Sequence, residues 1–592
     1  MMQRSNYFLA IFVVCLVYLV LGLQGVCIPP PPIECNVNHG CKIFNYMGIW
    51  EDRAACNAAT AAWPTSETEL LNAVANAVKN KQKIRVVSRL AHALPRLVCV
   101  GNQGLIISTQ NYASVVSVNK TAMTITVQSG AMMRDVIEEA AKEGFAFPAM
   151  IYWNGVSAAG VISTGAHGSG LAGKGSGVYE YVVAMRLVVP ASPSEGYAKV
   201  ISLTEADEDL EAARLSLGML GAISEITFSL EPMFKRSVSA TVKDDDDLEN
   251  VTESFLRDHE FAEITWIPSH RKVVFTSIDR VPVDTPGDGL CAIIGIPARV
   301  RDIETAASAY DTFQAEEDVD ALCHVIEQLM ISPVAIGGGF LNDEQNFTRY
   351  PVIGFNHHMQ ASGGCQGSHS NQANNLETCT PTKVLDKNAT VCTWDRRVQT
   401  TLGFDVELRV PMSLLREAIK DVKKIRNLNP RSLCDVAGIF IRSIKKSKAY
   451  LGPVDDVVAF ELKSYRPRKR GTPKWNEDVY EEIEQMVIEK YGGGLHWGKS
   501  GGYLFGGLTK KVVSFSKFLK VKDKFDVHGV FSNEWTNGLF GIGGNRVEEL
   551  RAGCALDKMC KCREDKHCAP NKGYYCKEGK VWKNARVCRK IN

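Results

Sequence analysis

The sequence GVSAAGVISTGAHGSG, residues 155–170, decides how the fold is interpreted. Its glycines and small residues lie where we expect a strand to turn, and a backbone without Cβ atoms can pass very close to a flat or phosphorylated ligand. Ser163, Thr164 and backbone N–H groups can donate to phosphate oxygens. A glycine-rich run alone also fits an ordinary turn, so the interpretation depends on partners elsewhere in the chain. His167 fits two roles, orienting the loop or contacting a reacting atom.

Length and composition indicate a globular protein of several domains. The chain has 592 residues, more than one ordinary hydrophobic core holds, which predicts two or three domains. Apolar residues make up 45% and charged residues 23%, which excludes a fibrous or disordered protein. The formal net charge of +2 gives no electrostatic reason to expect nucleic acid as a partner.

The first 25 residues predict a secretory signal peptide. Arg4 precedes an uncharged apolar run from Tyr7 to Leu23, and small or polar residues follow it up to Gly25. As a helix this run spans roughly 26 Å, less than the hydrocarbon core of about 30 Å. We expect cleavage near Gly25, and an uncleaved signal anchor is the alternative. No other stretch is long and apolar enough to span a membrane, so no stable span is expected after cleavage.

The cysteines also predict export. The chain has 18 of them, and dense spacing in short segments is typical of disulfide-stapled secreted proteins. Loss of Cys15 with the signal leaves an odd number, so at least one thiol is expected to be free. A zinc site with His567, the one histidine of the tail, is the alternative; the tail lacks a paired CxxC motif, and we expect no metal. Four cysteines follow the signal (Cys27, Cys35, Cys41, Cys56) and six lie in the tail (Cys554, Cys560, Cys562, Cys568, Cys576, Cys588).

Four glycosylation sequons favour the same route. N-x-S/T sequences begin at Asn119, Asn250, Asn346 and Asn388. They predict N-glycosylation in the secretory pathway, with the extracellular space, the cell wall or a vacuole as the final location.

The hydrophobic pattern divides the chain into five segments. We predict the signal peptide at 1–25, a Cys-rich leader at 26–58, a mixed α/β domain at 59–233, an α+β domain at 234–550 and a Cys-rich tail at 551–592.

Local patterns predict individual elements within this division. Ser66 is expected to cap a helix, because Glu67 and Glu69 follow it in the first turn. From residue 234 the pattern favours antiparallel strands with helices, and the acidic run 244–247 is expected to be a solvated loop. Helices are expected at 66–80 and 133–143, and strands at 84–87, 106–107, 125–127, 182–189 and 223–230.

One predicted strand carries charged residues side by side. In Phe404–Pro411 (FDVELRVP) alternate residues are apolar, so Asp405, Glu407 and Arg409 share the opposite face. A carboxylate beside a guanidinium can hold a polyol or a lactone through charge-assisted hydrogen bonds. The guanidinium can also stabilise negative charge on a cofactor. An ordinary exposed strand face is the alternative.

The loop Ser88–His92 (SRLAH) directly follows a predicted strand. Its N–H groups can cradle a pyrophosphate and place His92 beside a cofactor ring. A surface histidine near a turn is the alternative.

The segment Gly492–Lys499 (GGGLHWGK) combines four features that are useful at a redox site. It offers a flexible approach, a base at His496, a flat apolar wall at Trp497 and a cation at Lys499. A glycine-rich loop ahead of a helix is the alternative.

In combination these segments resemble the aldonolactone oxidoreductases, flavoenzymes with the vanillyl-alcohol-oxidase-type FAD-binding fold. The resemblance covers nearly the whole mature chain, and the Cys-rich tail and secretory leader direct it to the plant L-gulonolactone oxidase group. The matching segments follow in the expected order: Trp63–Ser66 (WPTS), 160–170 (GVISTGAHGSG), Leu217–Ile223 (LGMLGAI), Glu407–Arg409 (ELR), His496–Lys499 (HWGK) and Phe531–Asn533 (FSN).

This resemblance implies an α+β fold and FAD as the cofactor. It implies a two-subdomain FAD-binding (PCMH-type) domain at 59–233, an α+β cap domain at 234–550 whose sheet faces the isoalloxazine ring, and a small disulfide-rich tail. Several members attach FAD through the histidine of a G-x-G-H-S loop. Here Arg89 and Ala91 replace the glycines, while His92 keeps the family's distance to Cys99, so a covalent link stays open. The cofactor contacts implied are Ser88, Arg89, His92, Gly155, Val156, Gly160, Ser163, Thr164, His167, Gly168, Gly218, Ala222, Ile223, His496, Lys499 and Asn533.

The resemblance also implies a reaction of ascorbate biosynthesis. L-Gulono-1,4-lactone, or a close aldonolactone, would lose a hydride from C2 to the flavin and a proton from the C2 hydroxyl, and the product would rearrange to L-ascorbate. Glu407 would bind the hydroxyls and take the proton, Arg409 would stabilise the reduced flavin, and Lys499 would assist near flavin N1 or the substrate. Molecular oxygen would reoxidise the flavin and give hydrogen peroxide; another electron acceptor is the alternative.

Two other functions remain open at this point. One is a secreted flavin oxidase acting on oligosaccharides or cytokinins, against which the Glu407–Arg409 pair and the HWGK segment argue. The other is a non-catalytic glycoprotein whose Cys-rich tail binds cell-wall carbohydrate. A visible spectrum separates the second from a flavoenzyme, because bound flavin absorbs near about 380 and 450 nm.

Overall fold

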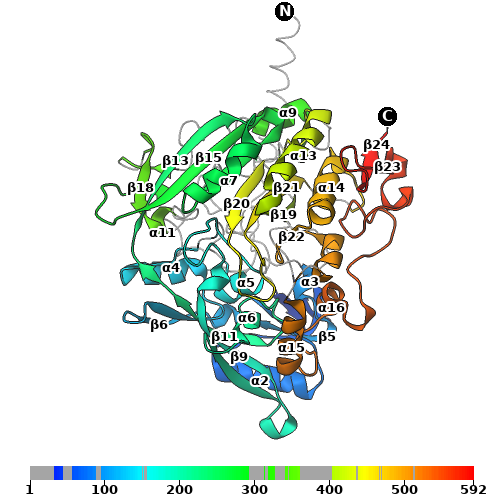
Figure 1. Ribbon diagram of the computed structural model, residues 1–592. Helices are drawn as coiled ribbons and strands as arrows, with labels where there is room; N and C mark the ends of the chain where they lie inside the picture. Colours follow the sequence, from blue (N-terminus) through cyan, green and yellow to red (C-terminus); the bar gives the residue numbers. More distant parts are fainter. Residues whose placement is uncertain are drawn as a thin grey trace, which may run out of the picture.

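Three large β-sheets carry the fold (Figure 1). Two five-stranded sheets are built from residues before 230, and an eight-stranded sheet is built from later residues. The computed structural model describes residues 33–43, 56–88, 95–149, 151, 156–291, 308, 312–313, 318–326, 340–343, 346–359, 403–434, 438–465, 467, 470–510, 512 and 514–591.

The first sheet contains the predicted strand at 84–87. Its order is β1 (Ile33–Asn36), β2 (Gly40–Ile43), β3 (Cys56–Ala62), β5 (Gly101–Ser108) and β4 (Ile84–Val87). The strands β3, β5 and β4 are parallel, and β1, β2 and β3 are antiparallel.

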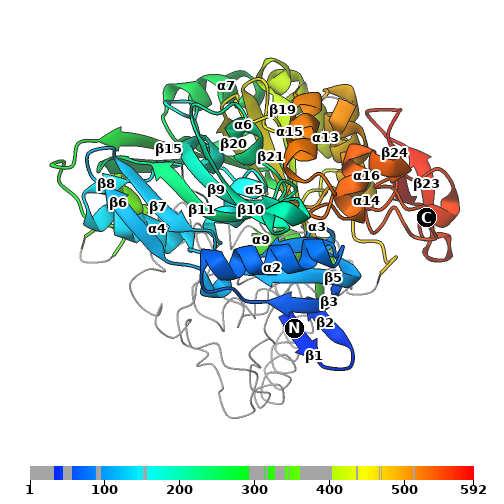
Figure 2. The ribbon, with the colours of Figure 1, turned by 90° about the horizontal axis from the view of Figure 1, so that it is seen from below.

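The second sheet is antiparallel throughout. Its order is β10 (Ala198–Thr204), β9 (Val182–Pro190), β11 (Ala222–Ser229), β7 (Thr124–Gln128) and β6 (Val115–Asn119). The helix α2 (Glu67–Lys79) lies between the two sheets (Figure 2), and Leu70 and Val74 pack with residues of both. Ser66 caps α2 by accepting the Glu69 N–H, as predicted, and the predicted helix at 133–143 is α4 (Met133–Lys142).

The glycine-rich stretch does not turn out of a strand, so that expectation is wrong. Its described part begins with α5 (Ala158–Ser163), a short helix that Ser157 caps by accepting the Gly160 N–H. The small residues of this stretch let α5 pack closely against its neighbours. Ala158 and Ile162 are fully buried there. The chain leaves the helix through Gly165, whose φ of +75° favours glycine.

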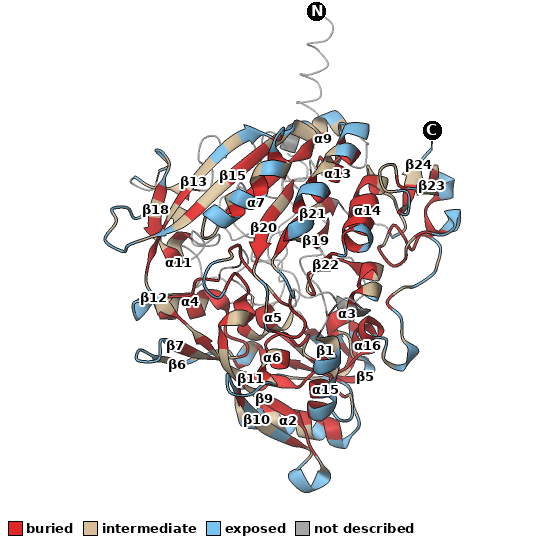
Figure 3. Cartoon of the chain, in the orientation of Figure 1, coloured by how far each residue is buried: buried red, intermediate tan, exposed pale blue. Residues whose placement is uncertain are grey.

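The eight-stranded sheet is antiparallel and largely buried (Figure 3). Helices α7 (Leu248–Asp258) and α13 (Leu415–Leu428) pack against each other over it (Figure 1). The strand order is β18 (Val352–Phe355), β13 (Lys235–Asp244), β15 (Lys272–Val281), β14 (Glu263–Ile267), β20 (Ile439–Ile444), β21 (Val457–Tyr465), β19 (Gly403–Pro411) and β22 (Gly494–Leu495).

The remaining elements are short or peripheral. They include the helices α3 (Pro95–Val98), α6 (Leu210–Ala213), α9 (Val319–Ile326), α11 (Asn356–Met359), α15 (Phe515–Phe525) and α16 (Glu534–Phe540), and the strand pairs β8 (Phe145–Ala146) with β12 (Glu231–Pro232) and β16 (Leu290–Cys291) with β17 (Phe340–Leu341).

The acidic run 244–247 is only partly solvated, which corrects the expectation. Asp245 is 1% exposed and accepts hydrogen bonds from Trp266 Nε1 at 2.8 Å and from Arg426 Nη1 at 2.6 Å. A buried carboxylate with such partners is held by the fold rather than by water.

The tail is a disulfide-linked unit. All six of its cysteines pair, as Cys554–Cys560, Cys562–Cys576 and Cys568–Cys588, and its hairpin consists of β23 (Tyr574–Glu578) and β24 (Arg586–Lys590). In the leader Cys35 pairs with Cys41, whereas Cys56 pairs with Cys99 beyond it. These pairs confirm the predicted disulfides.

The tail is held by the buried helix α14 (Glu477–Gln485). Glu482 accepts the backbone N–H groups of Lys580, Val581 and Trp582 at 2.6–2.7 Å, and Glu481 accepts that of Cys588 at 2.5 Å. We call these contacts the tail dock. Within the described part of the chain, none of the helices has the length and apolarity needed to cross a membrane.

Candidate active site

The charged face of β19 forms the floor of a buried cluster. Glu407 is 0% and Arg409 4% exposed, which rules out the ordinary exposed strand face. Alternation places the apolar residues of the strand on the other side, as predicted, in the hydrophobic core. Arg409 Nε donates to Glu407 Oε1 at 3.2 Å, so the pair is in direct contact.

Lys499 and two residues that sequence reasoning missed complete the charges. Lys499 Nζ lies 2.6 Å from Glu461 Oε1, 3.4 Å from Glu407 Oε2 and 3.6 Å from Asp405 Oδ1. Arg442 Nη2 lies 2.6 Å from Glu461 Oε2 and 3.6 Å from Glu407 Oε2. Glu461 and Arg442 come from strands β21 and β20, where each follows a run of apolar residues. A charged residue inside a largely apolar strand was the available signal.

His167 reaches this cluster from the glycine-rich stretch. Its Nε2 lies 2.8 Å from Glu407 Oε1 and its Nδ1 2.7 Å from the Gly168 carbonyl oxygen. The backbone around it is bonded to the large sheet, because Gly170 N–H donates to Ser443 O and Arg442 Nη1 donates to His167 O. Segments 240 residues apart therefore meet at Glu407.

The HWGK segment follows a strand that pairs with β19, and a 3-10 helix (Gly502–Lys510) begins shortly after it, so the segment does lie ahead of a helix. The strand β22 pairs Leu495 with Leu408, and His496 N–H donates to Glu407 O at 3.3 Å. His496 Nδ1 accepts the Gly498 N–H at 3.0 Å. Trp497 stacks on Phe505 in the core and donates through Nε1 to Leu451 O; its role as a flat wall for a ligand stays a prediction.

Burial and neighbouring charges shift the pKa values of several groups of the cluster in opposite directions. Burial raises the pKa of the Asp405 carboxyl to about 6, although Lys499 opposes the shift. Burial alone would also raise the pKa of Glu407, but His167, His496 and Lys499 hold that pKa well below its usual value. Burial lowers the pKa of His496 well below its usual range. For Lys499 burial acts downward, but Asp405, Glu461 and Glu407 raise the pKa of the ammonium.

Among the buried polar atoms of the cluster, Glu407 Oε2, Arg409 Nη2 and Asp405 Oδ1 make no hydrogen bond to the residues that the structure describes. Leaving such atoms without a partner costs about 1–3 kcal/mol each, more where the group is charged. An acceptor and a donor left open on one buried strand face suit a ligand that bears hydroxyls and develops negative charge.

A second convergence lies at the end of α5. Leu217 N–H donates to Ser163 O at 2.9 Å, and Gly218 has a φ of +64°. Arg85, which sequence reasoning missed, donates to the carbonyl oxygens of Leu217, Gly218 and Phe531 at 2.6–3.2 Å. The predicted segments at 160–170, 217–223 and 531–533 are thus joined. Burial lowers the pKa of the Arg85 guanidinium to about 10.

The other predicted contacts are placed as follows. Asn533 caps α16 and donates through Nδ2 to the carbonyls of Arg96, Leu97 and Cys99 at 2.7–3.2 Å, so it fixes the end of the loop that begins at Ser88. Ala222 and Ile223 are buried at the start of β11, Gly160 is exposed, and Ser88, Val156 and Thr164 are half-buried. Thr164 lies against the HWGK segment, because a Cβ on Gly498 would come within 2.9 Å of the Thr164 Cβ. Arg89, His92 and Gly155 lie outside the described residues.

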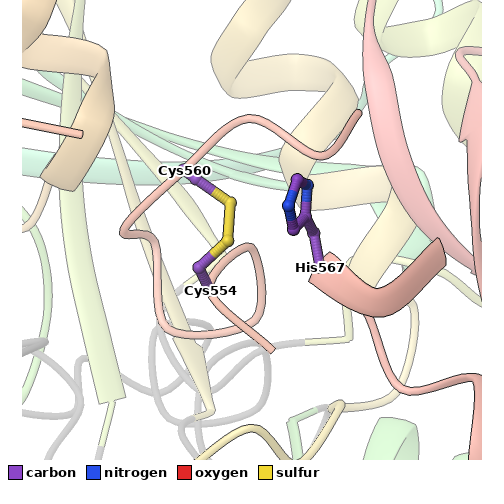
Figure 4. A group of neighbouring side chains, drawn as sticks. All are labelled: Cys554, Cys560 and His567. Atoms are coloured by element: carbon purple, nitrogen blue, oxygen red, sulfur yellow. A yellow bond between two sulfur atoms is a disulfide. The ribbon is translucent and has the colours of Figure 1, made fainter. Parts of the chain in front are cut away.

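The zinc alternative for the tail does not fit the sulfur chemistry. Cys554 and Cys560 lie beside His567, but their sulfurs form a disulfide (Figure 4) and are not thiolate ligands. In the candidate active site His167, Glu407 and His496 offer nitrogen and oxygen atoms within 4.8 Å of one another. Three cationic side chains surround that group, which disfavours a further cation.

Comparison with known proteins agrees with this geometry. Two relatives from Arabidopsis thaliana, L-gulonolactone oxidase 5 and L-gulonolactone oxidase 2, are each 39% identical over 95% of this chain and 94% of their own length. The chain belongs to the plant L-gulonolactone oxidase family. L-gulono-1,4-lactone dehydrogenase of Mycobacterium tuberculosis is 23% identical over 83% of this chain and 98% of its own length.

Family models match three regions. An FAD binding domain matches residues 58–192, D-arabinono-1,4-lactone oxidase matches 365–539, and the C-terminal domain of L-gulonolactone oxidase 2-like proteins matches 551–590. The protein is therefore an oxidoreductase of the FAD-dependent aldonolactone oxidase and dehydrogenase family. The domain boundaries predicted from the sequence stay predictions.

Solved structures confirm the vanillyl-alcohol-oxidase-type fold. A solvent-stable cholesterol oxidase aligns with a TM-score of 0.64 at 13% identity, covering 87% of this chain and all of its own. A chitooligosaccharide oxidase aligns with a TM-score of 0.54 at 14% identity, covering 85% and 96%. FAD fits the residues present, because the predicted loops at 160–170 and 217–223 are joined and Arg409 keeps an open donor for negative charge on a cofactor.

Proposed function

We propose that the protein oxidises L-gulono-1,4-lactone, or a close aldonolactone, at C2 and that the product rearranges to L-ascorbate. The observation that carries the proposal is the open pair on β19, Glu407 Oε2 and Arg409 Nη2, buried beside Lys499. A lactone with several hydroxyls offers hydrogen-bond donors to the first and developing negative charge to the second.

Each charged side chain has a part in this proposal. Glu407 Oε2 accepts the hydrogen of the C2 hydroxyl, orients the substrate and takes that proton. Arg409 and Lys499 stabilise the negative charge that accompanies the electron pair leaving C2. When bound, FAD supplies the acceptor for that hydride. Closure of the site by β22 and the His167 segment excludes water from the buried charges, which strengthens their interactions.

Molecular oxygen is the proposed final acceptor, with hydrogen peroxide as the product. The names of the two Arabidopsis relatives, both oxidases, support oxygen. The dehydrogenase name of the mycobacterial relative supports a different acceptor as the alternative.

The test mixes the purified flavoprotein with L-gulono-1,4-lactone without oxygen. The flavin bands near about 380 and 450 nm should bleach. Admission of air should restore the bands and yield hydrogen peroxide and L-ascorbate in equal amounts. Bleaching by a chitooligosaccharide or a cytokinin but not by any aldonolactone would overturn the proposed substrate, and a colourless protein would favour the carbohydrate-binding glycoprotein.

A covalent link between FAD and His92 is part of the proposal. The segment that carries His92 ends at Cys99, which a disulfide ties to Cys56, so its far end is anchored in the first sheet. Acid precipitation should leave yellow flavin on the protein, and His92→Ala should release it.

Export through the secretory pathway is also proposed. Asn119, Asn250 and Asn346 are exposed, as glycan acceptors must be, and the disulfides favour an oxidising compartment. Expression in plant cells with glycosidase treatment tests this, because an unglycosylated intracellular product would contradict it.

A further inference from the structure

His167 stands out because its ring reaches beyond its own loop to Glu407. The backbone of the loop is already fixed by hydrogen bonds from Gly168 N–H to Ser176 O and from Gly170 N–H to Ser443 O, and Arg442 donates to His167 O. The ring itself contacts two oxygen atoms, the Gly168 carbonyl oxygen and Glu407 Oε1.

Those contacts fix the number of protons that the ring carries. The Gly168 carbonyl oxygen can only accept, so at 2.7 Å it requires a hydrogen on Nδ1. The 2.8 Å contact between Nε2 and Glu407 Oε1 then requires one more hydrogen, either on Nε2 or on Oε1. Without it, a lone pair would face a carboxylate oxygen at hydrogen-bond distance. One proton is therefore shared between His167 and Glu407.

Burial lowers the pKa of the His167 imidazole below its usual value. Glu407 opposes that shift, whereas Arg442 and Arg409 act on the pKa in the same direction as burial. The shared proton is therefore inferred from the two hydrogen-bond contacts, not from the surrounding charge. Facing His167 and Glu407 are the carboxylates Asp405 and Glu461 and the cations Arg409, Arg442 and Lys499, while His496 lies 5.7 Å away ring to ring. With Glu407 the carboxylates number three, equal to the cations. The shared proton gives this cluster a net charge of +1, which suits a site that must receive the negative charge of a hydride.

We propose that His167 is a positioning residue that shares one proton with Glu407 and retains it while Glu407 accepts the proton of the substrate hydroxyl. The inference rests on the proposed function and adds a second proton-binding group to it. The O–H bond of the C2 hydroxyl breaks and an O–H bond forms at Glu407 Oε2. If the shared proton starts on Oε1, that bond breaks and an N–H bond forms at His167 Nε2. The C2 hydride leaves for FAD. After the proton transfers, His167 is an imidazolium and Glu407 a carboxylic acid.

The first test measures the proton itself and needs no substrate. In protein labelled with nitrogen-15 histidine, one of the 12 histidines should show both ring nitrogens in hydrogen bonds and a strongly deshielded Nε2 proton. This signal should be absent from His167→Gln and should shift in Glu407→Gln. A His167 Nε2 that neither carries a proton nor accepts one from Glu407 at neutral pH overturns the proposal.

The second test follows anaerobic flavin reduction by the lactone against pH. In His167→Gln a carboxamide can still donate to Glu407 but cannot take up a proton, so reduction should slow by roughly 10²-fold and the pH profile should lose an ionisation. The matched control is His567→Gln, because His567 is equally buried but lies in the tail; its rate and profile should equal the wild type.

Two outcomes of the second test would contradict the proposal. One is an unchanged rate in His167→Gln, and the other is a slower rate with the wild-type pH profile, which would mean a purely structural role. FAD content and the melting temperature of each variant show whether the fold survives. If no aldonolactone reduces the wild type, the proposed function fails, and the nitrogen-15 measurement still decides whether the proton is shared.

Discussion

Two clusters of buried carboxylates in the described part of the chain differ in how their oxygens are hydrogen-bonded. In the tail dock both oxygens of Glu482 accept backbone N–H groups. On the same helix Glu484 binds Lys558 of the tail at 2.5 and 2.6 Å. In the candidate active site Glu407 has four charged or ionisable neighbours. Burial and charge alone therefore do not mark a reactive site. Glu407 differs from the tail-dock glutamates in that its Oε2 accepts no hydrogen bond from the described residues.

We expect the largest difference in effect when a glutamate is replaced by glutamine in each of the two clusters. Glu407→Gln should lower the rate of lactone oxidation by about 10²–10⁴-fold, because the amide cannot take the hydroxyl proton. This corresponds to about 3–5 kcal/mol of transition-state stabilisation. The rate is measured as anaerobic flavin reduction, with FAD content as the control. Retention of more than a tenth of the wild-type rate would show that Glu407 only shapes the site.

In the tail dock the corresponding change should affect folding. Glu482→Gln leaves one oxygen for three N–H groups and turns an NH₂ group toward backbone donors, so the dock should weaken by about 3 kcal/mol. Limited proteolysis should then release the tail, while flavin reduction by the lactone proceeds at the wild-type rate. Glu489→Gln is the matched control, since Glu489 pairs with Lys561 at the surface and should contribute less than about 1 kcal/mol.

Sequence alone predicted charged residues of the candidate active site and missed the tail dock. Alternation along β19 identified Glu407 and Arg409, because a strand places every second residue on one face. It did not identify Arg442 or Glu461 as their partners, since the order of strands in an antiparallel sheet depends on pairings between distant segments. The tail dock was missed entirely. Four glutamates in one helix indicate a solvated surface unless the backbone that they bind is known.

The same limit explains the acidic run 244–247. A single residue of a polar segment, Asp245, is drawn into the core by Trp266 and Arg426, and no local pattern shows it. In contrast, His167 and Lys499 were found early, because glycines around a polar residue mark a close approach of the backbone. Long-range pairing, not local propensity, accounts for most of what the sequence left open.

A substitution at Asp245 tests whether a hydrogen-bonded carboxylate outside both clusters contributes to folding stability, as the tail-dock glutamates are expected to. Asp245→Asn should lower the free energy of unfolding by about 2–3 kcal/mol, because a buried ion pair with Arg426 loses its charge. Asp246→Asn is the control; its side chain is exposed and the effect should stay within about 0.5 kcal/mol. Equal melting temperatures for the two variants would show that the contact with Arg426 contributes nothing.

The smallest effect is expected at Asp405, the carboxylate of the candidate active site whose Oδ1 is also open. Burial raises its pKa to about 6 in the folded protein, above the unfolded value of about 3.9, so the folded state binds more protons between these limits. Its charged form therefore destabilises the fold above about pH 6, and this cost disappears as the pH falls toward 4. Asp405→Asn removes the charge at every pH. The variant should be more stable than the wild type by about 1–2 kcal/mol at pH 7.5, since Lys499 keeps Glu461 and Glu407 as partners.

The measurement compares calorimetric melting temperatures of the two proteins at pH 7.5 and pH 4.5. The gap in favour of Asp405→Asn should narrow at the lower pH, where the wild-type carboxyl is neutral as well. A gap that stays constant, or that favours the wild type at pH 7.5, would mean that Asp405 is satisfied in the way the tail-dock carboxylates are. The distinction between the two clusters would then apply to Glu407 alone.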